Sequence, residues 1–179
     1  MPMYENEKEL IRLCLNDDKK AQRKLVDQYG PPIFGYIKYY LNNASEAQDI
    51  LQEVFIAAFK SLTGFQGESS LYHWLKIIAK NKIYHHIKTK WKSSVDVIEP
   101  TSFPDSVMDE TILSTINKNE ILAEVDKLPE INKVVFLMHV VEGYRHQEIA
   151  TILEISEEAS RSRLFKAKKI LQESLKTYH

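Results

Sequence analysis

The 179-residue sequence has few residues of the kinds that build disulfide-rich, metal-binding or all-β proteins. Its one cysteine, Cys14, excludes a disulfide framework and any site made from several cysteines. Five glycines and six prolines are too few for the frequent turns of an all-β protein. The longest apolar stretch, Val134 to Val141, is too short to span a bilayer, and Met1 to Leu10 lacks the apolar core of a targeting signal. We therefore expect a soluble, intracellular, mostly helical protein with no integral membrane segment.

Motifs of catalytic chemistry are also absent from the sequence. It contains no Walker loop, no GxSxG and no GxGxxG. His85 and His86 are adjacent, so they cannot converge on one metal from a helix face. His139 and His146 are separated by Gly143, which we expect to end a helix. We expect no enzymatic activity, no metal site and no cofactor.

The formal net charge of −1 hides a segregated charge distribution. Residues 1–92 hold 14 Lys/Arg against 10 Asp/Glu, residues 93–115 hold none against 5, and residues 116–179 hold 10 against 10. Leu71 to Lys92 contains six lysines and no acid, and Ala159 to Leu171 contains five basic residues and no acid. Two such segments in a nearly neutral chain are either nucleic-acid contacts or solvated helix faces.

Capping residues and breakers predict helices in the first part of the chain. Asp17 and Asp18 are suited to cap a helix that Gly30 ends in the left-handed conformation. Pro31 and Pro32 suit the start of a second helix.

Apolar periodicity predicts two further helices before the middle of the chain. One begins near Ser45 and carries an apolar stripe to Leu62, and the other follows a loop over residues 63–70. Residues 93–115 have two prolines, five acids and no sustained period, so they read as a flexible acidic linker. The predicted domains are therefore residues 1–92 and 116–179.

The second predicted domain contains four helical patterns: residues 116–127, 130–142, 146–153 and 157–176. The last two are separated by a tight turn at residues 154–156, which is typical of a helix-turn-helix. Ile155 would fill the turn and Ser156 would cap the second helix. A helical hairpin inside a bundle is the alternative interpretation of the same pattern.

In a helix-turn-helix, the outer face of the second helix enters the DNA major groove. Arginine pairs with the two acceptors of guanine, and lysine neutralises phosphate. The residues expected on this face are Arg161, Ser162, Arg163, Phe165, Lys166 and Lys169.

Two sets of motifs resemble the sigma-70-type factors of bacterial RNA polymerase, in their short extracytoplasmic-function (ECF) group. The first set resembles region 2. It consists of Ala47-Gln48-Asp49-Ile50-Leu51-Gln52-Glu53-Val54-Phe55-Ile56, Phe65-Gln66-Gly67-Glu68-Ser69-Ser70, Trp74-Leu75 and Ile78-Ala79-Lys80-Asn81. The second set resembles region 4. It consists of Leu128-Pro129-Glu130, Val141-Glu142-Gly143-Tyr144, Gln147-Glu148-Ile149-Ala150, Ile155-Ser156-Glu157 and Arg161-Ser162-Arg163-Leu164-Phe165-Lys166-Ala167. The resemblance implies an all-α protein with a region-2 helix bundle and a region-4 helix-turn-helix.

The resemblance also implies the partners and their sites. The β′ coiled coil of core RNA polymerase would bind at Asp49, Gln52 and Glu53, and the β subunit of the polymerase would be a further partner. The −10 promoter element would be bound and opened by Phe65, Gln66, Tyr72, Trp74, Lys76, Lys80 and Asn81, and the −35 element by the face of residues 161–169. Trp74 is alternatively a core residue rather than a base-stacking platform. An anti-sigma factor and a cytoplasmic location are further implications.

Three residues depart from the family pattern. Glu154 and Glu158 stand where the family usually has glycine, and Ser160 stands where it has an apolar residue. We expect Ser160 to weaken packing unless its hydroxyl bonds to a carbonyl one turn earlier. Two other functions remain open at this point: a one-component helix-turn-helix regulator, and a helical protein-interaction module.

Overall fold

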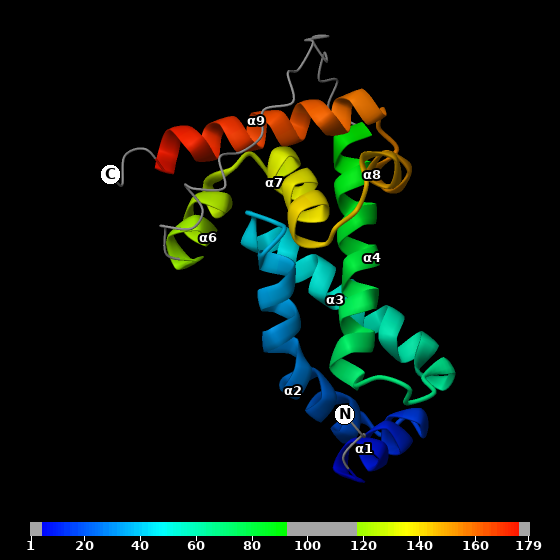
Figure 1. Cartoon of the computed structure of the whole chain (residues 1–179). Helices are drawn as coiled ribbons and strands as arrows, with labels where there is room; N and C mark the ends of the chain where they lie inside the picture. Colours follow the sequence, from blue (N-terminus) through cyan, green and yellow to red (C-terminus); the bar gives the residue numbers. More distant parts are fainter. Residues whose placement is uncertain (1–4, 93–117, 176–179) are drawn as a thin grey trace. The chain divides into compact units, whose positions relative to one another are not determined.

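The computed structural model describes residues 5–92 and 118–175, and every regular element in these two ranges is helical (Figure 1). The predicted all-α class is confirmed. The chain divides into two compact units, Met1–His86 and Ile87–His179, so that the division falls inside one helix. The expected linker at residues 93–115 lies outside the described residues, and the domain boundaries at 92 and 116 stay predictions.

The first unit is a helix bundle. Its elements are α1 (Glu5–Leu15), α2 (Lys19–Lys38), α3 (Ala44–Ser61), the 3-10 turn η1 (Leu62–Gly64) and α4 (Leu71–Lys92) up to His86. The helix α2 packs against α1 and α3, and the Tyr29 hydroxyl donates a hydrogen bond to Glu7 Oε1 at 2.5 Å. Buried side chains recur every three or four residues along α2, α3 and α4, as the sequence period predicts.

The helix α2 differs from the two helices expected from the sequence. It continues through Gly30, Pro31 and Pro32 without a break, and Gly30 does not adopt a positive φ. The two prolines cannot donate to the carbonyls of Asp27 and Gln28 one turn earlier. Because the two prolines and these two residues are exposed, water can satisfy the carbonyls at little cost. Burial of Tyr29, Gly30, Ile33 and Ile37 on the other side keeps the helix continuous.

Side-chain caps begin three helices of the first unit. Asp18 Oδ1 accepts from the backbone N–H groups of Lys20 and Ala21 at 2.8 and 3.0 Å, which confirms the predicted cap of α2. Ser70 Oγ accepts from the N–H of His73 at 3.2 Å and caps α4. The cap of α3 is Asn43, two residues before the expected start at Ser45. The helix α1 was not expected from the sequence, and Cys14 within it is a buried free thiol.

The second unit contains α6 (Lys118–Lys127), α7 (Glu130–Phe136), the π-helical turn η2 (Leu137–Val141), α8 (His146–Leu153) and α9 (Glu157–Leu175). The helices α6, α7 and α8 all pack against α9, which is the longest helix of this unit (Figure 1). Buried Lys133 donates from Nζ to Asp126 Oδ1 at 2.7 Å, which joins α7 to α6.

The predicted helix at residues 130–142 is present but changes type part-way. In η2 the N–H of Glu142 donates to the carbonyl of Leu137 at 3.0 Å, five residues back, which is the π-helical pattern. Gly143 then adopts a φ of 78° and ends the segment, as expected.

The continuity of α2 predicts the sign of a glycine substitution. Gly30→Ala should raise the free energy of unfolding by roughly 0.5–1 kcal/mol, because alanine stabilises a helix relative to glycine. The added Cβ would meet Val26 Cγ1 at 3.9 Å, an ordinary contact. Gly143→Ala is the matched control: it has open space but a positive φ, so it should lower stability. Thermal denaturation measures both, and a loss of stability in Gly30→Ala would contradict the continuous helix.

Candidate nucleic-acid interface

The helix-turn-helix of the second unit is formed by α8, the turn at residues 154–156 and α9. Its inner side buries Ile149 and Leu153 of α8 against Ala159, Leu164 and Ala167 of α9. Two capping contacts hold the helix starts: the backbone N–H of Arg145 donates to Glu148 Oε2 at 2.7 Å, and the N–H of Ala159 donates to Ser156 Oγ at 3.0 Å. The second contact confirms the predicted cap at Ser156.

The turn contains a non-glycine residue in the left-handed conformation. Glu154 has a φ of 54° and a ψ of 46°, the region that the glycine of the family pattern would occupy without strain. Its N–H still donates to the carbonyl of Ala150, so the helix end is closed in the usual way. Glu154 therefore closes the end of α8 in the left-handed conformation although it is not a glycine.

Five of the six residues predicted on the outer face of α9 have solvent access. Arg161, Lys166 and Lys169 are exposed, and Arg163 and Phe165 are half-buried. The sixth prediction is wrong: Ser162 is buried, with 4% of its surface exposed. It follows Ala159 by three positions, so the helical period returns it to the inner side, where its small side chain fits. The guanidinium of Arg161 forms an exposed ion pair with Glu157, one turn earlier.

Two histidines that the sequence separates lie together beside this motif. The rings of His139 in η2 and His146 in α8 are stacked, with centroids 4.4 Å apart and planes 15° apart. His146 Nδ1 lies 2.9 Å from Ser160 Oγ, and Ser160 is fully buried in α9. Ser160 is therefore satisfied by His146 of α8, and not by the carbonyl one turn earlier, which was the only compensation considered from the sequence. The reversal of the chain at Gly143 brings the rings together, and only this left-handed glycine signals it in the sequence.

The environment of His146 disfavours its charged form. Burial lowers its pKa to about 4, with further lowering from His139, Arg161 and Lys168 and a smaller opposing effect of Glu157. His146 is therefore neutral at neutral pH. Among residues 5–92 and 118–175, no group of three or more His, Cys, Asp or Glu side chains is arranged to hold a metal.

In the first unit, the predicted −10 residues lie on the loop before α4 and on α4 itself. Gln66, Tyr72 and Asn81 are exposed, and Phe65, Trp74, Lys76 and Lys80 are half-buried. The rings of Phe65 and Trp74 pack together with centroids 5.2 Å apart. Trp74 is thus neither a buried core residue nor a free platform, because one side of it is held by Phe65.

Sequence reasoning missed an aromatic group beside these residues. The Lys76 ammonium lies 4.6 Å from the ring centroid of Tyr36 in α2, which is a cation–π contact. Tyr36 also packs edge-on against Tyr40, and Tyr40 against Tyr84. The contact brings together residues 40 positions apart, and no local pattern in the sequence reports it.

The residues predicted to bind core polymerase share the exposed face of α3. Asp49, Gln52 and Glu53 are exposed, and Ile56 is 55% exposed beside them. Lys82 of α4 donates from Nζ to Glu53 Oε2 at 3.1 Å. The carboxylate of Glu53 therefore has a partner within the first unit.

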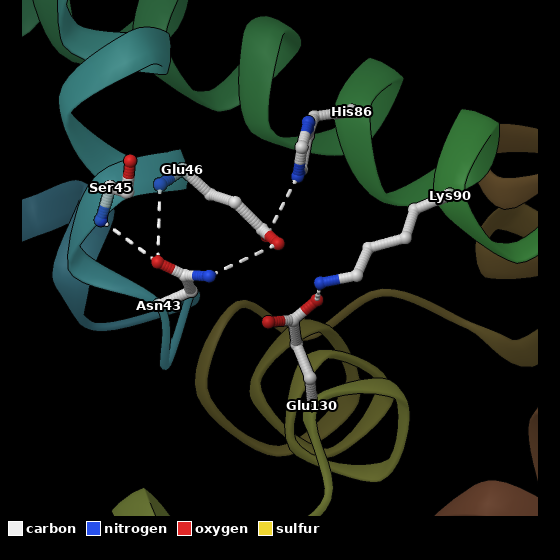
Figure 2. A network of polar contacts seen from close by, with 6 residues as sticks. All are labelled: Asn43, Ser45, Glu46, His86, Lys90 and Glu130. Atoms are coloured by element: carbon white, nitrogen blue, oxygen red, sulfur yellow. Dashed lines mark hydrogen bonds and ion pairs between the residues drawn. The ribbon is translucent and has the colours of Figure 1, made fainter.

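A polar network fixes the start of α3 against α4 (Figure 2). Asn43 Oδ1 accepts from the N–H groups of Ser45 and Glu46 at 2.8 and 3.4 Å. Glu46 Oε2 pairs with His86 Nε2 of α4 at 3.0 Å. Together with the Lys82–Glu53 pair, this network sets the direction in which the exposed face of α3 points within the first unit. The Lys90–Glu130 contact in the same figure, at 3.0 Å, belongs to the second unit.

Two sequence profiles of one family match the chain where these two sites lie. Sigma-70 region 2 matches residues 25–93, and Sigma-70, region 4 matches residues 118–171, which together are about two thirds of the chain. The chain belongs to the sigma-70 family. The resemblance noted in the sequence is thereby confirmed.

Relatives of known type place this sigma factor in the ECF group. It is 29% identical over 186 residues to the RNA polymerase sigma-H factor of Pseudomonas aeruginosa, covering 98% of this chain and 96% of that protein. It is 27% identical over 173 residues to the ECF RNA polymerase sigma-E factor of Escherichia coli K12, covering 90% of each.

A solved structure is also similar to this sigma factor. It is the sigma factor RpoE in complex with the anti-sigma factor NepR from Bartonella quintana, with 18% identity, a TM-score of 0.44 and coverage of 86% of this chain and 96% of that one. The two region matches do not favour the one-component regulator or the interaction module.

In the described ranges 5–92 and 118–175, no helix has the length and apolar character needed to cross a membrane.

The neutral state of His146 predicts a pH dependence of stability. Its pKa is near 6.5 in the unfolded chain and lower in the folded one, so protons bind preferentially to the unfolded state. The free energy of unfolding should fall as the pH drops from about 6.5 toward 4. Thermal denaturation at intervals across this range measures the effect.

A variant that cannot titrate isolates the contribution of His146 from that of the carboxylates. His146→Phe should show a flatter dependence on pH than the wild type over the same range. His73→Phe, which removes an exposed histidine of the first unit, should keep the wild-type slope. Identical slopes for His146→Phe and the wild type would show that His146 is not held neutral by the fold.

Proposed function

We propose that this sigma factor uses three surfaces to start transcription. The outer face of α9 binds the −35 element, the loop before α4 together with α4 binds and opens the −10 element, and the exposed face of α3 binds core RNA polymerase. The observation that carries the proposal is the face of α9: it is free of acids over residues 159–171 and presents Arg161, Lys166 and Lys169 to solvent.

The face of α9 has the chemistry that DNA recognition needs. The exposed arginine offers paired donors to a guanine edge, and the two exposed lysines offer charge to phosphates. Glu157 and Glu158 lie in the first turn, where they favour the helix electrostatically. The exposed Arg161–Glu157 pair contributes little to stability, so phosphate or base can replace Glu157 as the partner of Arg161.

The −10 surface combines exposed amides, aromatic rings and lysines. Gln66 and Asn81 supply amide groups, Tyr72 supplies an exposed ring, and Lys76 and Lys80 supply positive charge. Holding an unstacked base requires stacking and hydrogen bonding, and following the backbone of a single strand requires positive charge. The packed Phe65–Trp74 pair supports the loop from which Gln66 projects.

The polymerase surface on α3 mixes acid, amide and apolar groups. Ile56 lies on the same side as Gln52 and Glu53, because helix positions three and four apart are neighbours. An exposed isoleucine with a polar border is typical of the centre of a protein interface. Its proposed partner is the β′ coiled coil, and the β subunit is a further proposed partner of the protein.

The remaining parts of the proposal follow from family membership. We infer that the protein is a non-enzymatic subunit without a cofactor, that it works in the cytoplasm, and that an anti-sigma factor holds it until a signal releases it. The acidic residues Asp96, Glu99, Asp105, Asp109 and Glu110 lie outside the described residues, and their proposed place is the interior of the polymerase.

A substitution on α9 tests −35 recognition. Arg161→Ala should weaken promoter binding by the reconstituted holoenzyme by roughly 1–3 kcal/mol, the range for one direct base contact. Binding to core polymerase should not change. Arg12→Ala is a matched control, since Arg12 is an exposed arginine paired with Glu9 on a helix of the first unit. Equal promoter affinity for Arg161→Ala and Arg12→Ala would contradict the assignment.

A substitution on α4 tests promoter opening. Asn81→Ala should form closed complexes like the wild type but open the −10 element less, because a hydrogen-bonding group for the displaced strand is lost. Permanganate reactivity of unpaired thymines measures opening, and gel retardation measures closed complexes. Unchanged thymine reactivity would show that Asn81 is only a solvated residue on α4 with no role in promoter opening.

A further inference from the structure

The inner side of α9 contains a buried hydroxyl where the family pattern has an apolar residue. Ser160 has no exposed surface, and its Oγ lies 2.9 Å from Nδ1 of His146, the first residue of α8. Apolar contacts between helices tolerate small rotations, but a hydrogen bond restricts both distance and angle. The contact therefore constrains the rotation of α9 against α8 more tightly than an apolar pair would.

A second ring restricts His146 itself. The imidazole of His139 is stacked on it, and His139 Nδ1 lies 2.8 Å from the carbonyl oxygen of Tyr144. A carbonyl only accepts hydrogen bonds, so His139 carries its hydrogen on Nδ1 and its ring orientation is determined. The chain Tyr144–His139–His146–Ser160 thus connects η2, the loop after it, α8 and α9.

The position of Ser160 bears directly on the DNA face. Arg161 is the next residue, so its direction differs from that of Ser160 by one helical step of about 100°. Any rotation of α9 that the His146–Ser160 contact prevents would turn Arg161 and Lys166 by the same angle. Base-edge contacts need this direction to be correct, while phosphate contacts tolerate error more readily.

We propose that His146 is a positioning residue for promoter recognition: through its hydrogen bond to Ser160 and its stacking on His139, it sets the rotation of α9 that directs Arg161 and Lys166 toward base edges. The inference rests on the proposed role of α9 at the −35 element. It assigns to His146 no contact with DNA.

The charges around the pair agree with this role. His139 faces His146 from η2, and Arg161 and Lys168 face it from α9, with Glu157 as the opposing charge. A proton on His146 would be repelled by three of these groups, and its pKa is lowered accordingly. The neutral ring keeps the stack and the hydrogen bond intact.

The test separates base recognition from general DNA affinity. Holoenzyme made with the full chain first selects a preferred −35 sequence from a promoter pool randomised at that element. Dissociation constants are then measured for the selected promoter and for one with a scrambled −35 element. Discrimination is the dissociation constant for the scrambled promoter divided by that for the selected promoter. Ser160→Ala and His146→Phe should each lower this ratio by roughly three- to tenfold, the effect of one net hydrogen bond. Affinity for the scrambled promoter should stay at the wild-type level.

Three further variants complete the design. The double variant His146→Phe/Ser160→Ala should lose no more discrimination than either single variant, because both remove the same contact. His146→Asn keeps a hydrogen-bonding atom near the position of Nδ1 and should retain part of the discrimination. Ser61→Ala removes a helical hydroxyl of the first unit, bonded to the Ala57 carbonyl at 2.8 Å, and should behave as wild type.

Each other outcome counts against the inference. Equal losses of affinity for both promoters, in step with a lower melting temperature, would show a role in folding only. Unchanged discrimination in Ser160→Ala or in His146→Phe, or additive losses in the double variant, would also overturn it. Failure of the wild-type holoenzyme to select any −35 sequence would instead overturn the proposed function of α9, and the inference with it.

Discussion

The second unit depends on one helix that serves two purposes. The helices α6, α7 and α8 all pack on α9, so the inner side of α9 supplies the common contact surface of the unit. The same helix carries its cations outward at Arg161, Lys166 and Lys169. The two sides alternate within 19 residues, so a change of helical rotation moves core and charged residues together. The backbone that carries the proposed DNA surface is therefore held by the core behind it, and substitutions on the inner side can affect the outer side without any direct contact.

The first unit shows a comparable coupling through side-chain contacts. The exposed face of α3 is held by Glu46–His86 and Lys82–Glu53, both of which reach to α4. The helix α4 also carries Lys76, Lys80 and Asn81, so the proposed polymerase and −10 surfaces share one support. The first of these pairs is only partly buried and the second is exposed, so their value lies in orientation more than in stability. Charges of opposite sign are thus segregated between two helices of the first unit: acids lie on the exposed face of α3, and lysines lie on α4.

Most helices could be predicted from the sequence, because period and capping are local properties. The caps at Asp18 and Ser156 and the helix end at Gly143 were predicted correctly. The helix break that the sequence predicted at Gly30 and Pro31 is absent from the structure, because burial on the other side of α2 outweighs the local cost of the prolines. At the site, Arg161 and Lys166 were predictable from charge and period. The burial of Ser162 also follows from its spacing of three residues from Ala159, and the sequence analysis missed it because the residue is polar. The contact of Lys76 with Tyr36 joins positions 40 residues apart and had no local signal, and the pairing of His146 with His139 was signalled only by the glycine between them.

The π-helical turn at η2 has a consequence for insertions and deletions. A π-helical turn holds one more residue than an α-helical turn, so it shifts the phase of everything that follows by about 100°. Deleting one residue between Leu137 and Val141 would allow this segment to continue as an α-helix. The residues after it would then enter the loop on a different side of the helix axis. The length of this short segment is therefore as important to the arrangement of the motif as its composition. A related segment that replaces η2 should have the same number of residues, even if the residue types differ.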